Sequence, residues 1–174
     1  ILGGNREQAC QDATQMVEEV GAFGVIGQGG QSGVFSECAA GRDLMVFNGG
    51  AYYSEAWYDE QHPYVWANTM DCERGSAHVA EYIGKRLIGK PAKFAGDPEL
   101  AQQERKFATD VPEDEEYGHC VDGTERTVRE EYGGEGSQVI VRYQLDISRF
   151  AEQAQRAVVQ CKAEGVTTVT MAAD

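Results

Sequence analysis

The stretch AFGVIGQGGQSGVFSECAAGRDLMVFN, residues 22–48, holds two short apolar runs separated by a glycine-rich turn and a run of small residues. The first apolar run, Phe23 to Ile26, is too short for a helix, and five of the next seven residues are Gly or Ser. This pattern predicts a parallel strand buried on both faces, then a helix over 34–40 and a strand over 44–47. Because open α/β sheets bind ligands at the carboxyl ends of their strands, the turn from Gly27 to Gly33 is the first candidate site.

The same alternation of helix and strand continues along the chain. We expect helices over 6–19, 71–87 and 117–131, a helix begun by Asp146 or Ser148 and ended by Gly165, and strands over 64–67, 105–110, 139–143 and 166–171. The last helix should bury Ile147, Phe150, Ala151, Ala154, Val158 and Cys161. Asn5 is a suitable N-cap for the first helix. The aromatic-rich residues 51–62 read as a loop, and residues 89–104 as a surface excursion with a turn of helix after Pro98.

These elements predict an α/β protein with two doubly wound parallel-sheet lobes. We assign residues 1–68 to part of the first lobe and residues 69–174 to part of the second, with the hinge crossing near 67–71. The pattern opens on a helix and closes on a strand, so we expect both lobes to be incomplete at their ends. A complete small domain that starts on a helix is the alternative.

Composition excludes several classes of protein. The formal net charge of −14 argues against nucleic-acid binding, because phosphates require a basic face. No stretch approaches the roughly 20 apolar residues of a membrane span, so we expect no direct span in this chain. The three histidines lie far apart in the sequence, so no metal site is predicted.

The five cysteines form no C-x-x-C pair, which leaves a zinc ribbon or a redox motif without support. An odd number of cysteines permits at most two internal disulfides, and the sequence does not choose the pairs. A buried free thiol is the alternative for a cysteine within a predicted helix.

The glycine-rich turn allows three interpretations. A dinucleotide would use glycines to bring the backbone close to a pyrophosphate, but the spacing departs from the strict fingerprint. The next strand ends in Asn48, Gly49 and Gly50, where an acidic residue would be expected to bind a ribose. The other interpretations are a tight turn without a ligand and a small polar solute held by backbone amides and Ser32. No acid–base pair or nucleophile motif is visible, so we expect neither a catalytic role nor a cofactor.

Four segments, taken in order, resemble type 1 periplasmic solute-binding proteins, above all the branched-chain (Leu/Ile/Val) amino-acid-binding proteins of ABC transporters. NREQACQDATQMVEEVGAFGVIGQGGQSG, residues 5–33, looks like that family's helix, its strand ending in Val-Ile-Gly and its first ligand-binding loop. LMVFNGGAYYSE, residues 44–55, is similar to the next strand and the second ligand-binding loop. PYVWANTMDCERGSAHVAEYI, residues 63–83, looks like the crossing into the second lobe, and Tyr117-Gly118 resembles the start of a second-lobe helix.

The resemblance implies a non-catalytic protein that closes two lobes on a small polar solute, with an amino-acid-like molecule as one candidate. It implies a membrane permease of an ABC transporter as partner and a periplasmic or extracellular location, as a lipid-anchored or secreted protein. By position, the ligand-binding residues would be Gln31, Ser32, Gly33, Gly49, Gly50, Ala51, Tyr52 and Tyr117. Backbone amides at strand ends suit a carboxylate, and aromatic faces suit an ammonium group.

Two points stay open at this stage. The aromatic residues Tyr52, Tyr53, Trp57 and Tyr58 either enlarge or cover the pocket, or they pack as an ordinary surface loop. The function has two rivals, a Rossmann-like enzyme that binds a nucleotide on Gly27 to Gly33 and a structural fragment that binds no small molecule.

Overall fold

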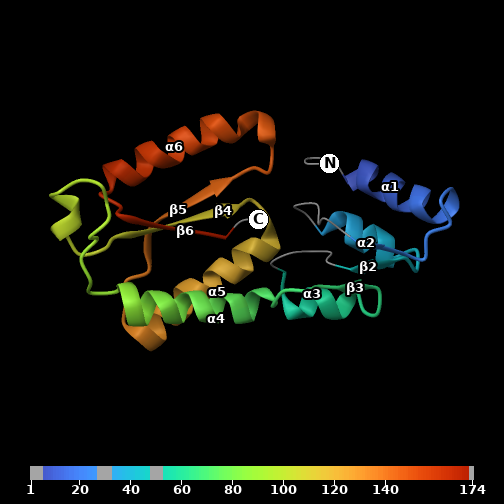
Figure 1. Cartoon of the computed structure of the whole chain (residues 1–174), viewed down its shortest axis with the longest axis horizontal. Helices are drawn as coiled ribbons and strands as arrows, with labels where there is room; N and C mark the ends of the chain where they lie inside the picture. Colours follow the sequence, from blue (N-terminus) through green and yellow to red (C-terminus); the bar gives the residue numbers. More distant parts are fainter. Residues whose placement is uncertain (1–5, 27–32, 48–52, 173–174) are drawn as a thin grey trace. The chain divides into compact units, whose positions relative to one another are not determined.

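The computed structural model describes residues 6–26, 33–47 and 53–172 (Figure 1). The chain forms two compact units. Unit 1 comprises Ile1–Cys72 with Leu145–Ile147 and Asp174, and unit 2 comprises Glu73–Gln144 with Ser148–Ala173. No described helix combines the length and the apolar character needed to cross a membrane.

Unit 1 alternates helices with short strands. Its elements are α1 (Arg6–Glu18), β1 (Gly24–Ile26), α2 (Val34–Ala40), β2 (Met45–Phe47), α3 (Glu55–Glu60) and β3 (Val65–Trp66). The strands form a parallel sheet in the order β1-β2-β3. The helices expected over 6–19 and 34–40 are confirmed, as are the three strands. The N-cap expected at Asn5 and most of the glycine-rich turn lie outside the described residues.

One face of this sheet is buried beside α2. Val46 and Val65 are 1% and 3% exposed, and Leu44 before β2 is also buried. Helix α1 packs against α2, and a disulfide between Cys10 and Cys38 joins the two helices. The alternative of a buried free thiol is therefore wrong for this pair, and also for Cys72 and Cys120, which are disulfide-bonded.

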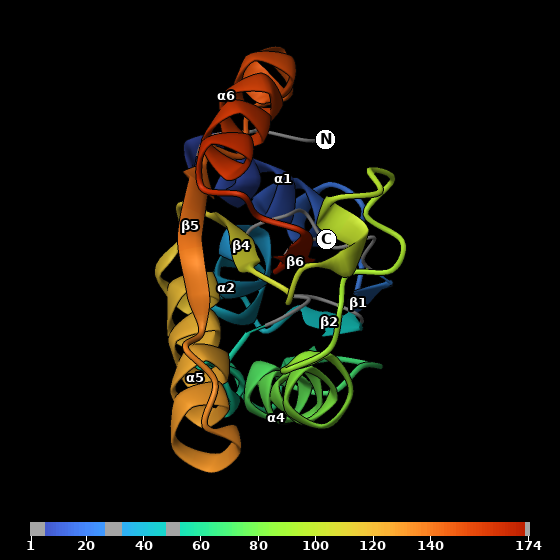
Figure 2. The same cartoon turned by 90° about the vertical axis from the view of Figure 1, so that its left-hand side faces the viewer.

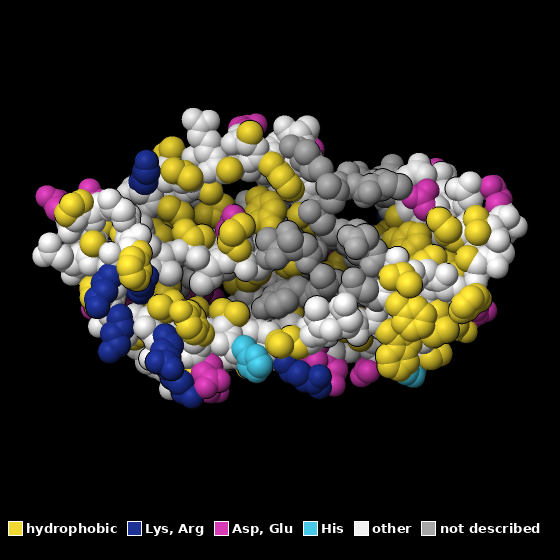
Figure 3. Space-filling view, viewed as in Figure 1, with side chains coloured by type: hydrophobic (Ala, Val, Ile, Leu, Met, Phe, Trp, Pro, Cys, Tyr) yellow, Lys and Arg dark blue, Asp and Glu magenta, His cyan; other side chains and the backbone are white. Residues whose placement is uncertain are grey.

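The other face of the sheet in unit 1 is exposed, so the prediction of a first strand buried on both faces is wrong. The strand-end residues Ile26, Phe47 and Trp66 are neighbours in register, and 88%, 42% and 46% of their surfaces are exposed. Figure 3 shows hydrophobic side chains gathered on the surface of unit 1. Burial of a strand requires a layer on each face, and the described helices of unit 1 leave this row uncovered.

Helix α3 replaces part of the loop expected over residues 51–62. Ser54 begins the helix, and its hydroxyl accepts a hydrogen bond from the backbone N–H of Trp57 at 3.1 Å. This N-cap satisfies a backbone donor that has no partner within the helix. The aromatic composition conceals the helix, because aromatic residues are typical of strands and loops as well.

Unit 2 contains the remaining elements, although Cys72 and Ile147, the first residues of α4 and η3, belong to unit 1. In chain order they are α4 (Cys72–Tyr82), the π-helical turn η1 (Ile83–Leu87), the 3₁₀ turn η2 (Leu100–Gln102), β4 (Phe107–Pro112), α5 (Glu115–Tyr132), β5 (Ser137–Tyr143), the 3₁₀ turn η3 (Ile147–Arg149), α6 (Phe150–Ala163) and β6 (Thr168–Met171). The turn expected after Pro98 is confirmed as η2. Strand β4 lies two residues later than the expected 105–110. Helix α5 begins earlier than expected, because the Asp114 carboxylate accepts a hydrogen bond from the Glu116 N–H at 3.0 Å.

The sheet of unit 2 is parallel, in the order β5-β4-β6. The crossover from β4 to β5 and the crossover from β5 to β6 run in opposite directions, so right-handed connections place their helices on opposite faces. Figures 1 and 2 show α6 on one side of the sheet and α5 with α4 on the other. On the α4–α5 side, an apolar cluster contains Ala80, Ile83, Phe107 and Val128.

The burial predicted for the last helix is partly wrong. Ala154 is exposed, as is Val158 at 52%, whereas Gln153 is buried and bonds to the backbone N–H and C=O of Gln144. Helix α6 packs on β5 and leaves the same face of β6 open, where 68% of the Met171 surface is exposed. A helix with no partner on one side exposes apolar side chains that its periodicity assigns to a core.

A buried carboxylate links α5 to the strands. One Glu125 oxygen accepts hydrogen bonds from the Ser137 N–H at 2.8 Å and from the Arg129 guanidinium at 3.0 Å. The other oxygen accepts from the Thr109 hydroxyl at 3.4 Å. Because Thr109 also lies 2.8 Å from the hydroxyls of Ser137 and Thr170, this network connects all three strands of unit 2.

Candidate functional site

The predicted ligand-binding residues are only partly described. Gly33 in unit 1 and Tyr117 in unit 2 are described. The others lie outside the described residues; they are Gln31, Ser32, Gly49, Gly50, Ala51 and Tyr52. The structure therefore gives the surroundings of two of the eight positions, each within its own unit.

Gly33 lies at the N-cap of α2 and is buried. Its backbone N–H donates a hydrogen bond to the phenolic oxygen of Tyr53 at 2.5 Å. A Cβ atom at Gly33 would lie 2.2 Å from Cε2 of Tyr53 and 2.5 Å from Cζ2 of Trp57. The absence of a side chain at Gly33 thus allows two aromatic rings to pack directly on the start of α2.

The aromatic rings are held by a polar chain that crosses unit 1. The Tyr53 and Trp57 rings meet edge to face with centroids 4.6 Å apart, and both side chains are buried. The Trp57 indole N–H donates to the Glu37 carboxylate at 3.2 Å, and Arg6 forms an ion pair with the same carboxylate at 3.0 Å. These contacts connect α3 through α2 to α1. The aromatic stretch was expected either to line the pocket or to pack as an ordinary part of the fold. Tyr53 and Trp57 are packed.

Tyr117 lies in the first turn of α5, directly after the carboxyl end of β4. Its backbone N–H donates to the Asp114 carboxylate at 3.4 Å, as part of the N-cap of the helix. Only 1% of its surface is exposed. The position follows the end of the central strand, as expected of a ligand-binding residue in an open α/β sheet.

A second polar group near the end of β4 is Asp110. Its Oδ1 atom is buried and has no hydrogen-bond partner among the described residues. Burial raises the pKa of this carboxyl group. Burial and the nearby Asp110 also raise the pKa of the Cys161 thiol on α6, which is a free cysteine.

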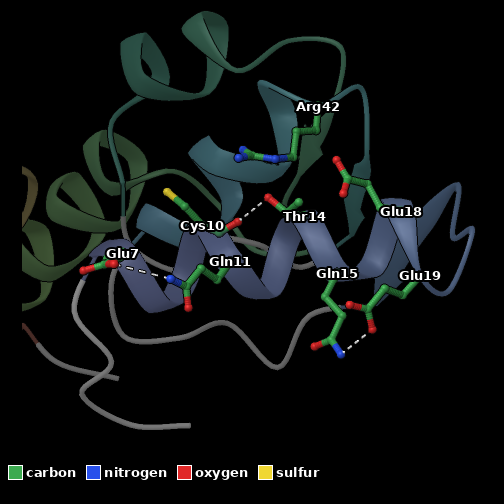
Figure 4. A pocket seen from close by; sticks show the side chains of 8 residues that line it. All are labelled: Glu7, Cys10, Gln11, Thr14, Gln15, Glu18, Glu19 and Arg42. Carbon is green, nitrogen blue, oxygen red and sulfur yellow. Dashed lines mark hydrogen bonds between the residues drawn. The ribbon is translucent and has the colours of Figure 1, made fainter.

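The described part of unit 1 also contains a pocket of about 330 Å³ beside α1 (Figure 4). Its lining is polar and mostly helical: Glu7, Cys10, Gln11, Thr14, Gln15, Glu18, Glu19 and Arg42. Arg42 is fixed by a hydrogen bond from its guanidinium to the Cys38 carbonyl at 2.8 Å. None of the predicted ligand-binding residues lines this pocket, so it is separate from the site that the sequence indicates.

Clusters of metal ligands are absent from the described ranges. No group of three or more His, Cys, Asp or Glu side chains there could hold a metal ion. The His119 imidazole lies 3.3 Å from the Glu73 carboxylate, but more than 40% of each side chain is exposed. Exposed pairs of this kind are common on protein surfaces.

Sequence reasoning missed the hydrogen bond between Gly33 and Tyr53, the contacts of Glu37 and the burial of Asp110. A signal existed for Gly33, because a buried turn glycine often marks a close approach of another group. The local sequence contains no comparable signal for Glu37, whose two partners lie 20 and 31 residues away.

Comparisons with known proteins give matches at the level of structure. No family model and no curated sequence matches the chain. It is similar to an ABC-transporter solute-binding protein from R. palustris in complex with 4-hydroxybenzoate, with a TM-score of 0.64, 14% identity and coverage of 96% of this chain and 39% of that one.

Two further solved structures are similar. An extracellular ligand-binding receptor from Rhodopseudomonas palustris HaA2 has a TM-score of 0.58 and 14% identity, over 99% of this chain and 42% of that chain. An ABC-transporter substrate-binding protein from Desulfitobacterium hafniense in complex with Leu has a TM-score of 0.56 and 15% identity, over 97% of this chain and 44% of that chain.

The chain therefore has the parallel α/β fold of type 1 periplasmic binding proteins, and it spans about two fifths of the length of the proteins it matches. The resemblance drawn from the sequence is confirmed at the level of the fold. All three similar structures are binding proteins by description. At 14–15% identity they do not assign a ligand to this chain.

Proposed function

We propose that this chain is part of an extracytoplasmic solute-binding protein that delivers a small polar solute to the membrane permease of an ABC transporter. The observation that carries the proposal is the match of 96% of the chain to a solute-binding protein at a TM-score of 0.64. The solute would bind at the carboxyl ends of the parallel strands, where open α/β sheets bind ligands. The protein would bind and release its solute without chemical change.

The disulfide supports the proposed location. Cys10 and Cys38 are 28 residues apart in the sequence and join two helices of unit 1. Structural disulfides persist in oxidising compartments and are rare in the cytosol. A periplasmic or extracellular protein, secreted or lipid-anchored, would keep this bond.

The solute class follows from the strand ends and from the similar structures. Leu and 4-hydroxybenzoate, the two solutes in those complexes, both carry a carboxylate. Backbone amides at glycine-rich strand ends suit a carboxylate, and because the Gly33 amide already donates to Tyr53, its neighbours would supply them. We therefore propose a small carboxylate, held in unit 1 by the residues around Gly33 and by residues 49–52, and in unit 2 by Tyr117. The hinge crossing near 67–71 stays a prediction.

A thermal-shift screen followed by calorimetry tests the proposal. The ligands are leucine and other amino acids, 4-hydroxybenzoate and related aromatic acids, NAD and ATP. A ligand at 100 times its Kd stabilises the folded chain by about 2.7 kcal/mol, which is easily measured. Stabilisation by a carboxylate solute supports the proposal. Stabilisation by NAD or ATP alone would favour the nucleotide-dependent enzyme, and no stabilisation by any of them would favour a structural fragment.

Two substitutions then test the residues. Ser32→Ala removes a hydroxyl at the first strand end, and Tyr117→Phe removes the phenolic oxygen while keeping the buried ring. Each should weaken binding of the identified solute by about tenfold, as expected when one hydrogen bond to a charged group is lost. Tyr82→Phe, at a tyrosine that is 60% exposed on α4, is the matched control and should bind normally. Unchanged affinity in both test variants would reject these site residues.

A further inference from the structure

One end of unit 2 carries an exposed basic surface that the proposed function does not use. We define it by Lys85, Arg86, Lys90, Lys93 and Lys106, together with Phe94; all six side chains are exposed. Four of these cations fall within residues 85–93, which contain no acidic residue, although the whole chain has a net charge of −14. Figure 3 shows dark blue side chains gathered at this end of unit 2.

The backbone that carries the basic surface is well anchored. The Ala92 N–H donates to the Gln103 carbonyl at 3.0 Å, and the Arg105 N–H donates to the Lys90 carbonyl at 3.3 Å. The Ala92 side chain is fully buried. Residues 90–92 therefore pair with residues 103–105, and they present Lys90 and Lys93 from a packed loop.

Much of the positive charge is uncompensated. Arg86, Lys90 and Lys93 form no ion pair with any described residue, whereas Lys85 pairs with Glu81 at 2.5 Å. The nearby acids in residues 85–106 are Asp97, Glu99 and Glu104, against six Lys or Arg side chains. The Asp97 carboxylate is occupied, because it accepts hydrogen bonds from two backbone N–H groups of its own turn.

A single aromatic ring stands among these cations. Phe94 is 93% exposed. Within the described residues 83–106, no other large hydrophobic side chain is exposed. A stable protein interface usually buries about 800 Å² per partner and contains an apolar core. One aromatic ring is too small to form such a core. A cluster of cations with an aromatic anchor instead has the composition of surfaces that bind anionic lipid headgroups.

We propose that this basic surface docks unit 2 on an anionic phospholipid bilayer. Lys106 directly precedes Phe107, the first residue of β4, so the basic surface lies at the amino end of the central strand. Pro112 ends β4, and Tyr117 follows at the carboxyl end. Docking would therefore leave the carboxyl end of the strand free. The acidic remainder of the chain would be repelled by the same bilayer, which favours this one orientation. The inference does not depend on the identity of any solute.

Vesicle co-sedimentation of the 174-residue chain tests the proposal. We expect binding to equimolar phosphatidylglycerol and phosphatidylcholine vesicles at low salt, loss of binding at high salt, and no binding to pure phosphatidylcholine. The double variant Lys90→Glu/Lys93→Glu should bind at least about 25-fold more weakly, since one basic residue near an anionic bilayer contributes roughly fivefold. Phe94→Ser should weaken binding by about tenfold.

The matched control reverses two exposed charges elsewhere on unit 2. Arg126→Glu/Arg149→Glu changes the net charge by the same amount and should bind within about twofold of the parent chain. Equal loss of binding in both double variants would overturn the proposal, as would equal binding to neutral and anionic vesicles. Binding to heparin or to an acidic polypeptide through Lys90 and Lys93, without binding to anionic vesicles, would also overturn it. Circular dichroism establishes that each variant is folded.

Discussion

Both units contain a three-stranded parallel sheet, but different interactions stabilise the two sheets. Unit 1 has strands of two or three residues. The row of Ile26, Phe47 and Trp66, which are neighbours in register, is largely exposed. Its helices are joined by a disulfide, and its aromatic rings pack on Gly33. Unit 2 has a six-residue central strand, β4, whose residues are almost all buried. An apolar cluster and the Glu125 network hold that strand between its neighbours.

The difference shows what each unit needs for its stability. Where strands are short and one face is open, a covalent bond and a close aromatic contact restrict the chain. Where strands are longer, burial and hydrogen bonds to a central strand stabilise the unit, in addition to the disulfide bond of Cys120 on α5. We therefore expect unit 1 to depend mainly on the Cys10–Cys38 bond and the aromatic contact, and unit 2 mainly on its buried strand and the Glu125 network.

The largest expected effect concerns the disulfide. Cys10→Ser/Cys38→Ser should lower the free energy of unfolding of unit 1 by about 3 to 4 kcal/mol, the value for closing a loop of this length. Hydrogen exchange measured by mass spectrometry should show faster exchange in α1 and α2 and little change in β4. Faster exchange of β4 to the same extent would contradict the separate stability of the two units.

The corresponding test for unit 2 is Glu125→Leu. The substitution leaves the buried Ser137 N–H without its acceptor and should cost about 2 to 3 kcal/mol, measured by urea denaturation. Arg129→Ala removes the half-exposed partner of the same carboxylate and should cost about 1 kcal/mol or less. If the two variants lost equal stability, the ion pair and not the bond to the strand would be the stabilising contact.

In unit 1, Gly33→Ala tests the aromatic contact. The added Cβ would overlap the buried Tyr53 and Trp57 rings, so we expect a loss of about 1 to 3 kcal/mol in thermal unfolding. Gly41→Ala, at the other end of α2, is the matched control, because its nearest atom would lie 3.5 Å from the new Cβ. A Gly33 variant as stable as the Gly41 variant would show that the rings can move aside.

The smallest effect is a pH dependence in unit 2. Burial raises the pKa of Asp110, so the folded state binds this proton more tightly than the unfolded state. Its contribution to stability is therefore greatest at low pH and falls as pH rises from about 4 through the raised pKa. Asp110→Asn should be more stable than the parent at pH 7 and should lose this part of the pH dependence. Asp122→Asn, at an exposed position of α5, removes the same charge and is the matched control.

The sequence predicts the order of elements well because helix and strand periodicities are local. Helix α2 and the strand ends on either side of it occur where the pattern from Ala22 to Asn48 predicts them. The sequence does not predict burial or disulfide pairing where these depend on segments that are distant in the chain. Ile26 and Val158 have the pattern of buried residues, yet no described element covers them. The Cys10–Cys38 pair follows from the packing of α1 on α2, which no local pattern contains.

The candidate site is less predictable than the fold. The position of Gly33 could be inferred from its place after a strand, but its partner Tyr53 lies 20 residues away and is set by tertiary packing. The choice of a binding protein over a nucleotide-dependent enzyme came from the resemblance of ordered segments, because the glycine-rich turn alone suits either one.

The central claim is that a small carboxylate binds at the carboxyl ends of the parallel strands. The most direct measurement is a titration of the isotope-labelled chain with the stabilising solute, followed by amide chemical shifts in NMR spectra. We predict saturable shifts that are largest at Gly33 and its neighbours in unit 1 and at Tyr117 and Gly118 in unit 2. Shifts confined to the α1 pocket around Gln11 and Gln15, or no saturable shift with any carboxylate solute, would contradict the claim.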